Sequence, residues 1–340
     1  MPLRRPSAKM AGMKLLIVTH HRLDLWIAPP WFVDRLRIEF PQSEVVRLTS
    51  YDNVEKELPE TEVAFSYSIR PEQLQFANKL RWVHSPAAAI HQFLYPAFVS
   101  SDILLTNARE VHGPVVAEHV LALIFTLAKR IPEHVRNQVK RVWGQEKLWL
   151  EGRCPREVAG STLGLVGLGS IGRNVAKHAS ALGMKVIAVR EHPETSKPEF
   201  VDEVLPAAGL NEMLSRSDYV VLSPPLTPAT RGMIGHDQLR TMKPGGYLIN
   251  VGRGPLIDET ALHEALREHK IGGAALDVFE NEPLSPDSPL WNLDNLLITP
   301  HTAGMTTNLW ERHYTLFSEN LRRYLAGQPL LALVEKKRGY

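Results

Sequence analysis

The sequence predicts an α/β protein with two doubly wound, parallel-sheet domains. Two series of short apolar segments alternate with segments of helical spacing, one from residue 14 to about 106 and one from Ser161 onward. Parallel strands need crossover connections of this kind, so each series predicts an open twisted sheet with helices on its faces. A third observation is the glycine-rich turn from Gly167 to Gly172, which lies between a predicted strand and a predicted helix.

The first series begins with an apolar run rich in branched residues, which is typical of a buried strand. Its expected strands are 14–18, 45–48, 62–65 and 80–83, and its expected helices are 31–40 and 71–77. Pro71 fits the first turn of the second helix. The segment 114–130 follows, apolar on most faces, and predicts a helix buried either in the core of one subunit, between domains or in a dimer interface.

The second series supplies six more expected strands and three helices. The strands are 163–166, 184–189, 219–222, 246–251, 273–276 and 296–298, and the helices are 171–182, 259–269 and 308–325. The last helix is expected to carry the chain back to the first unit. We therefore expect a disordered extension over 1–12, a discontinuous substrate domain of 13–106 and 303–340, and a dinucleotide-binding domain of 107–302.

Composition argues against several classes of protein. The 340 residues carry 39 basic and 37 acidic side chains, a net charge of +2, so no nucleic-acid partner is expected. The single cysteine, Cys154, allows no intrachain disulfide and indicates a reducing compartment. We expect no membrane span, because no stretch approaches ~18 apolar residues. The apolar run after the basic N-terminus is too short for a secretory signal, so we expect a cytoplasmic protein.

The glycine-rich turn has the pattern and the context of a dinucleotide-binding fingerprint. Gly167 permits the tight turn, and Gly169 lets a pyrophosphate approach the backbone. The amides of the helix that opens at Ser170, Ile171 and Gly172 supply donors and a favourable dipole for that anion. A single match of this pattern is weak evidence, but here strand, turn, helix and next strand agree.

Three further segments place chemistry at the carboxyl ends of strands, where ligands bind in open α/β sheets. Arg253, Asp277 and His301 each lie at or just beyond the end of a strand, and Glu282 lies in the loop after its strand. Taken singly, such residues more often form surface ion pairs or structural contacts. Together they suit the reduction of a keto acid, since Arg253 can bind a carboxylate and His301 can donate a proton. Glu282, if bonded to the imidazole, orients it and favours its protonated form.

These segments resemble the D-isomer-specific 2-hydroxyacid dehydrogenases over nearly the whole chain. The motifs that carry the resemblance are 167–172, 225–230, 242–254, 275–283 and Pro300-His301. The resemblance implies two doubly wound domains with the active site in their cleft, usually in a homodimer whose contact includes the 114–130 helix. It gives Arg253, Glu282 and His301 the catalytic roles, and it places Asp277 near the nicotinamide carboxamide.

The resemblance also implies two sets of binding residues and no metal site. The cofactor set is Gly167, Gly169, Ser170, Ile171, Gly172, Arg190, Pro225, Thr230, Val251, Gly252 and Asp277. The substrate set is Ser68, Ile69, Ala88, Ala89, Arg253 and His301. Ala89 replaces a glycine that is common in the family, so we expect a changed turn there. His91 replaces an aspartate, and we expect it to be structural.

The residue after the 184–189 strand predicts NADP(H) rather than NAD(H). An NAD site places a carboxylate there to bind the ribose hydroxyls, and this chain has Arg190. Its guanidinium can pair with the extra phosphate of NADP. The alternative is that Glu191 turns inward and binds the diol while Arg190 faces solvent, since adjacent side chains of a strand point in opposite directions.

The sequence thus predicts an oxidoreductase that moves a hydride between NAD(P)H and C2 of a small 2-keto or D-2-hydroxy acid. The reductive direction is expected, with glyoxylate, hydroxypyruvate or pyruvate as the substrate class. A formate dehydrogenase, and a phosphoglycerate enzyme with a regulatory C-terminal domain, are less favoured. The alternative from another class is a nucleotide-sensing, corepressor-like binding protein on the same fold.

Overall fold

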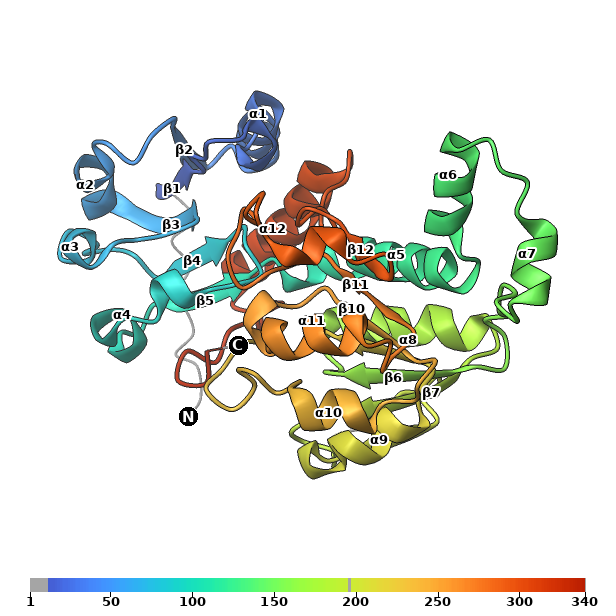
Figure 1. Ribbon diagram of the computed structural model, residues 1–340. Helices are drawn as coiled ribbons and strands as arrows, with labels where there is room; N and C mark the ends of the chain where they lie inside the picture. The colour runs from blue at the N-terminus through green and yellow to red at the C-terminus, as the bar shows by residue number, and fades with distance from the viewer. Residues whose placement is uncertain (1–11, 195–196, 340) are drawn as a thin grey trace. The chain divides into compact units, whose positions relative to one another are not determined.

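A computed structural model describes residues 12–194 and 197–339, and the chain divides into two compact α/β units (Figure 1). Unit 1 comprises the described residues up to His112 together with those from Thr306 onward, and unit 2 is Gly113–Met305. Almost all of the extension expected over residues 1–12 lies outside the described residues. The expected borders, after residues 106 and 302, fall a few residues before these divisions.

Unit 1 contains a five-stranded, all-parallel sheet in the order β2-β1-β3-β4-β5. This is a doubly wound order, because the chain runs outward from β1 first to one edge and then to the other. Its strands are β1 Met13–Val18, β2 Ser43–Leu48, β3 Thr61–Ser66, β4 Trp82–Ser85 and β5 Leu104–Asn107. Its helices are α1 Pro30–Glu39, α2 Val54–Glu57, α3 Pro71–Leu74, α4 Pro96–Ser100 and α12 Leu309–Leu325.

Three short elements of unit 1 show how the structure differs from the sequence expectation, and the short helices α2 and α4 were not expected either. The helix expected over 71–77 ends at Leu74, because Phe76 and Ala77 donate to carbonyls three residues back and tighten the chain into turns. The strand expected from residue 80 begins at Trp82, with Leu80 buried in the loop before it. The strand β5 was not expected, since half of its four residues are polar.

Unit 2 contains a seven-stranded parallel sheet in the order β12-β11-β10-β9-β6-β7-β8. The strand order reverses between β6 and β9, the kind of switch point at which open sheets bind ligands. Its strands are β6 Thr162–Val166, β7 Lys185–Val189, β8 Glu203–Leu205, β9 Tyr219–Leu222, β10 Tyr247–Asn250, β11 Gly273–Leu276 and β12 Leu296–Ile298. Its helices include α8 Ser170–Ala181, α9 Leu210–Arg216, α10 His236–Thr241 and α11 Glu259–Arg267.

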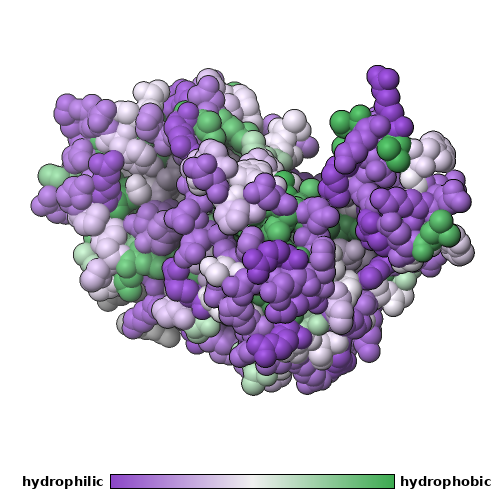
Figure 2. All heavy atoms as spheres, viewed as in Figure 1, coloured by the Kyte–Doolittle hydropathy of each residue, from purple (hydrophilic) through white to green (hydrophobic). Residues whose placement is uncertain are grey.

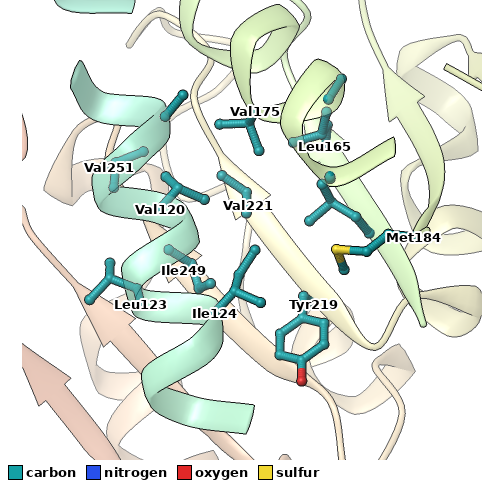
Figure 3. Packing of buried hydrophobic residues seen from close by; sticks show 14 of the residues in the cluster. Val120, Leu123, Ile124, Leu165, Val175, Met184, Tyr219, Val221, Ile249 and Val251 are labelled. Atoms are coloured by element: carbon teal, nitrogen blue, oxygen red, sulfur yellow. The ribbon is translucent and has the colours of Figure 1, made fainter. Parts of the chain in front are cut away.

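The long helix α5, Arg109–Ala128, supplies one wall of the unit 2 core (Figure 3). Val120, Leu123 and Ile124 pack there with residues of the sheet such as Val221 and Ile249. By length and composition α5 is apolar enough to cross a membrane, and 50% of its most apolar stretch is buried. The expectation that no apolar stretch approaches the length of a membrane span is therefore wrong, although buried core helices can have the same length and composition.

Beyond α5, the helices α6 (Ile131–Val139) and α7 (Gln145–Leu150) expose apolar side chains. Figure 2 shows hydrophobic residues at the surface of this arm among hydrophilic ones. Trp143, in the connection, is 90% exposed. The large apolar side chains exposed between residues 131 and 150 are Ile131, Val135, Val139, Val142, Trp143, Trp149 and Leu150. We call this set the apolar arm.

Candidate active site

The glycine-rich turn joins β6 to α8 at the switch point of the unit 2 sheet. Gly167 has φ +93°, a left-handed conformation that favours glycine. A Cβ on Gly172 would lie 2.1 Å from the carbonyl oxygen of Gly167, so the first turn of α8 can pack on the strand only with glycine there. A Cβ on Gly169 would meet no atom within 4 Å. Open space therefore adjoins the N-terminus of α8, where Ser170 and Ile171 begin the helix.

Two more loops begin at the carboxyl ends of neighbouring strands. After β9, the Thr230 hydroxyl donates to the carbonyl of Pro225 over 2.7 Å and accepts from the Thr227 amide over 2.8 Å, which closes a compact loop. After β10, Val251 is buried, and the Gly252 amide donates to the side chain of Asn250 over 3.0 Å. Because β6, β9 and β10 are adjacent parallel strands, both loops begin at the same edge of the sheet as the glycine-rich turn.

Arg253 follows β10 and is positioned by Asn250. The Asn250 amide donates to the Arg253 carbonyl over 2.9 Å, and the Arg253 guanidinium donates to the Gly252 carbonyl over 2.6 Å. Burial lowers the pKa of Arg253, and the nearby charge of Glu282 opposes that shift. An arginine keeps its proton in proteins, so this is a half-buried cation next to a carboxylate.

His301 and Glu282 meet directly in unit 2. The Nδ1 of His301 lies 2.6 Å from Oε2 of Glu282, and Oε1 of the same carboxylate accepts the Phe279 amide over 3.0 Å. The carboxylate is thereby fixed on both oxygens and orients the ring. His301 has φ +53° and its side chain is 52% exposed, which leaves it accessible to a ligand.

Asp277 anchors the chain on both sides of His301. Its side chain is 1% exposed and accepts the Thr299 hydroxyl over 2.6 Å, the Thr302 amide over 2.9 Å and the Ala303 amide over 3.0 Å. His119, on α5, reaches the same cluster, with Nε2 3.1 Å from the Thr299 hydroxyl. His119 could not be predicted as part of the site, because one imidazole in an apolar helix follows no pattern.

Arg190 follows β7 directly, and its backbone amide donates to Leu205 of the neighbouring β8. Its side chain is half-buried, and its Nε and Nη2 atoms are buried without a hydrogen-bond partner among the described residues. Glu191 is exposed. Two orphaned guanidinium nitrogens in this place fit an anionic ligand, so the residues present agree with a phosphate-bearing nucleotide.

The predicted substrate residues of unit 1 lie on two turns that Gln92 links. The Gln92 amide donates to the carbonyls of Tyr67 and Ala89, over 2.8 and 3.4 Å. The first turn carries Ser68 and Ile69, and the second carries Ala88, whose carbonyl accepts the Asn107 amide over 2.7 Å. His91 is exposed at the start of a short helix next to the second turn.

The nucleotide-binding part of the chain matches the model of a known protein family. The family model described as "D-isomer specific 2-hydroxyacid dehydrogenase, NAD binding domain" matches residues 121–303. The chain belongs to the D-isomer-specific 2-hydroxyacid dehydrogenases. The resemblance and the two-unit α/β fold predicted from the sequence are thus confirmed.

Relatives within this 2-hydroxyacid dehydrogenase family differ in length. A glyoxylate reductase of Thermofilum pendens is 37% identical over 279 residues, which cover 79% of each chain. A D-3-phosphoglycerate dehydrogenase of Methanocaldococcus jannaschii is 35% identical over 260 residues, covering 75% of this chain and 47% of the relative. The chain therefore spans about half the length of the phosphoglycerate dehydrogenases that it matches.

Solved structures of the family share the fold. A D-isomer specific 2-hydroxyacid dehydrogenase from Xanthobacter autotrophicus, in complex with NADPH, has a TM-score of 0.80 and 30% identity, covering 97% of this chain and 100% of that one. A D-lactate dehydrogenase from Aquifex aeolicus, complexed with NAD and lactic acid, has a TM-score of 0.71 and 27% identity, covering 92% and 96%. The family thus includes members bound to either nicotinamide cofactor.

Among the described residues, no group of three or more histidine, cysteine, aspartate or glutamate side chains is arranged to hold a metal ion. The charged groups of the candidate site are Arg253, Glu282 and His301, with Asp277 buried beneath the loop. This set can bind an anion and exchange a proton.

Proposed function

We propose that this protein is an NAD(P)-dependent oxidoreductase that reduces small 2-keto acids to D-2-hydroxy acids. The substrate class is glyoxylate, hydroxypyruvate or pyruvate, in keeping with the similarity to a glyoxylate reductase. The observation that carries the proposal is the 2.6 Å contact between His301 and Glu282, next to Arg253, at the strand ends that follow the glycine-rich turn.

The nucleotide is held by the residues around the switch point. Gly167, Gly169, Ser170, Ile171 and Gly172 face its pyrophosphate with the α8 N-terminus. The loops after the neighbouring strands complete the nucleotide site through Pro225, Thr230, Val251, Gly252 and Asp277. When bound, the reduced cofactor supplies the hydride that adds to C2 of the keto acid.

Arg253 and His301 act on the substrate. The fixed guanidinium of Arg253 binds the carboxylate and the carbonyl oxygen. His301 donates its proton to that oxygen as the C–O bond becomes single, and Glu282 orients the ring through its contact with Nδ1. In the reverse direction, the neutral imidazole takes the hydroxyl proton. Loss of a positioned proton donor costs about 10²- to 10⁴-fold in rate.

The two turns of unit 1 are proposed to bind the substrate carboxylate through Ser68, Ile69, Ala88 and Ala89. In the part of the chain that the structure describes, the amides of Ile69, Ala88 and Ala89 donate to no protein acceptor. Free amide donors on two linked turns suit an anion. Ala89→Pro removes one of these amide donors and should raise KM for the keto acids, and an unchanged KM would contradict the assignment.

The experiment is consumption of reduced cofactor with a panel of 2-keto acids, by the native protein, His301→Ala and the control His178→Ala. His178 is half-buried on α8 and has no role in the proposal. We expect turnover by the native protein and the control, and a loss of about 10²- to 10⁴-fold in His301→Ala. Cofactor binding without turnover on any keto acid favours the alternative, a nucleotide-sensing, corepressor-like protein.

We propose that NADP(H) is preferred over NAD(H), because Arg190 has two buried nitrogens without a partner among the described residues. A charge-assisted hydrogen bond to the extra phosphate contributes ~1.5–3 kcal/mol, or about ten- to a hundred-fold in affinity. The test is the ratio of kcat/KM for NADPH and NADH with one keto acid. Arg190→Asp should move this ratio toward NADH. A native preference for NADH shows instead that Glu191 or another residue binds the ribose.

We propose that the protein is a cytoplasmic homodimer joined through the apolar arm and α5. An exposed apolar surface of this extent marks an interaction site. Light scattering should give twice the monomer mass, and Val139→Asp with Trp149→Ser should shift it toward the monomer. A monomer mass for the native protein across a wide concentration range contradicts the dimer. Cell fractionation tests the location, and neither a membrane nor a nucleic acid is proposed as a partner.

A further inference from the structure

His119 contacts the loop that carries His301, although it is distant in sequence and lies on α5. Its Nε2 is 3.1 Å from the Thr299 hydroxyl and 3.7 Å from Oδ1 of Asp277. Thr299 in turn lies 2.6 Å from that same carboxylate oxygen. The three side chains form a continuous chain of polar contacts inside unit 2.

The donors around Asp277 fix the direction of the hydrogen bonds in this chain of contacts. The carboxylate of Asp277 receives the amides of Thr302 and Ala303, which can only donate, so both of its oxygens act as acceptors. The one hydroxyl proton of Thr299 therefore goes to Asp277. The Thr299 oxygen can then only accept from His119, which must carry a proton on Nε2. Burial lowers the pKa of His119, against the opposing charge of Asp277, and this favours the neutral ring, whose proton the contact with Thr299 places on Nε2.

These polar contacts lead to a residue with a strained backbone. His301 has φ +53°, and a residue other than glycine keeps a left-handed conformation only where its surroundings impose it. Its amide donates to the carbonyl of Asp277 over 2.9 Å, while the Asp277 side chain binds the next two amides. The backbone on both sides of the imidazole is therefore fixed by Asp277 and Thr299.

We propose that His119 is a positioning residue for the proton donor. By donating to Thr299 it holds the Thr299–Asp277 pair, and with it the backbone of the loop, so that the His301 ring stays aligned with Glu282. This inference rests on the proposed role of His301. It predicts that loss of the His119 donor lowers turnover without weakening cofactor binding.

The test compares His119→Phe, which keeps the ring and removes the donor, with His119→Gln, whose amide can donate to Thr299. We expect kcat to fall about ten-fold in His119→Phe, short of the ~10²-fold cost of a 1 Å misplacement. KM for the cofactor should stay unchanged, and His119→Gln should recover most of the turnover. His178→Phe is the matched control, since His178 is also half-buried on a helix of unit 2.

A second measurement does not depend on activity. In the cofactor-free protein labelled with ¹⁵N-histidine, the Nδ1 proton of His301 bonded to Glu282 should give a downfield signal, assigned by its loss in His301→Ala. This signal should broaden or vanish in His119→Phe and persist in His119→Gln and His178→Phe. Thr299→Val breaks the same chain, so combining it with His119→Phe should add little further loss.

The outcomes separate this inference from the proposed function. If His301→Ala turns over normally, the proposed function is wrong. If His301→Ala is inactive while His119→Phe and Thr299→Val keep native kcat and the native His301 signal, the positioning role of His119 is wrong. A similar loss of kcat in His178→Phe would also overturn the positioning role of His119, because replacing any half-buried histidine of unit 2 would then have the same effect.

Discussion

The two units bury polar side chains in opposite ways. In unit 2, the Asp277 carboxylate is 1% exposed and accepts three donors, so its charge is compensated and it holds a loop. In unit 1, His84 and His313 are fully buried in an aromatic core, where Nε2 of His84 and both ring nitrogens of His313 have no partner among the described residues. Both units are parallel α/β structures, so the difference is not a property of the fold.

The unit 1 histidines pack as aromatic rings. His84, on β4, stacks on Phe65 with ring centroids 5.2 Å apart, and His313, on α12, lies 5.0 Å from Trp310. Burial lowers the pKa of His84 to about 3, and burial with the charges of His112 and His84 lowers the pKa of His313 as well. Both rings are thus neutral, and His84 keeps one polar contact, between its Nδ1 and the Thr106 hydroxyl at 2.8 Å. In unit 2, buried polarity is compensated and holds the loop that carries His301, whereas in unit 1 we expect it to make the fold sensitive to acid.

Removing one acceptor from the Asp277 cluster should have the largest effect on stability. In Asp277→Asn, the new amide group faces one of the donors that the carboxylate now accepts. A buried donor left without an acceptor costs about 1–3 kcal/mol, and a bond to a charge is lost as well, so we expect about 2–4 kcal/mol. Urea unfolding at neutral pH measures this loss.

The control for this variant is Asp258→Asn. Asp258 caps α11 by accepting the amides of Thr260 and Ala261, and asparagine is an equally good N-cap. The same chemical change should therefore leave the free energy of unfolding nearly unchanged there. Equal losses in the two variants would show that the Asp277 contacts are no more stabilising than a surface cap.

The second prediction is a loss of unit 1 stability in acid. Both histidines have a folded pKa below the ~6.5 of the unfolded chain, so the unfolded state binds more protons below that pH. Stability is thus complete above pH ~6.5 and falls as the pH drops toward about 3. The slope reaches about 1.4 kcal/mol per pH unit for each histidine. Urea unfolding between pH 7.5 and 5 measures it.

His313→Phe isolates one of the two groups. Phenylalanine fills a similar volume next to Phe65 and Trp310, and it loses no hydrogen bond, since both ring nitrogens of His313 lack a partner in the described chain. We expect little change at pH 7.5 and a clearly smaller acid slope. His263→Phe, on α11 in unit 2, is the comparison and should keep the native slope. An unchanged slope in His313→Phe would mean that other groups cause the acid loss.

Local pattern accounts for most of the fold. The strands β9 and β11 have the expected bounds, because each is a short apolar run between polar or glycine residues. The strand β8 was not expected, since its three residues include Glu203 and it lies at the edge of the sheet, where it pairs with β7. The strand β5 was missed for the same reason, because Thr106 and Asn107 make its second half polar. Such strands are determined by their neighbours and not by their own residues.

The candidate site also combines residues that local pattern predicts with residues that only tertiary packing brings in. The pairing of Glu282 with His301 was expected, because each residue belongs to a recognisable segment at a strand end. Asn250 and His119 were not given roles, since their contacts depend on tertiary packing. The cofactor preference, the dimer and the bound substrate remain predictions.

The smallest effect is expected at the C-terminal segment of unit 1. The Lys336 ammonium donates to the carbonyls of Phe98, Ser101 and Ile103, over 3.0, 2.6 and 3.0 Å. The segment also pairs with β5, where the Val334 amide donates to Leu105 over 2.8 Å. Burial lowers the pKa of Lys336, so the carbonyls replace only part of its hydration. The ammonium thus fastens the end of the chain onto α4 and β5.

Lys336→Met keeps the length of this side chain and removes its three donors. Hydrogen bonds to a charged group contribute ~1.5–3 kcal/mol when fully formed, but the site is partly open to water, so we expect about 1 kcal/mol. Hydrogen exchange should quicken in residues 331–335 and in β5, while unit 2 keeps its native protection. Lys337→Met, at the exposed neighbouring position, should change neither. If exchange in unit 2 quickens as much as in unit 1, the polar contacts of the two units are not independent, and the contrast between them is weakened.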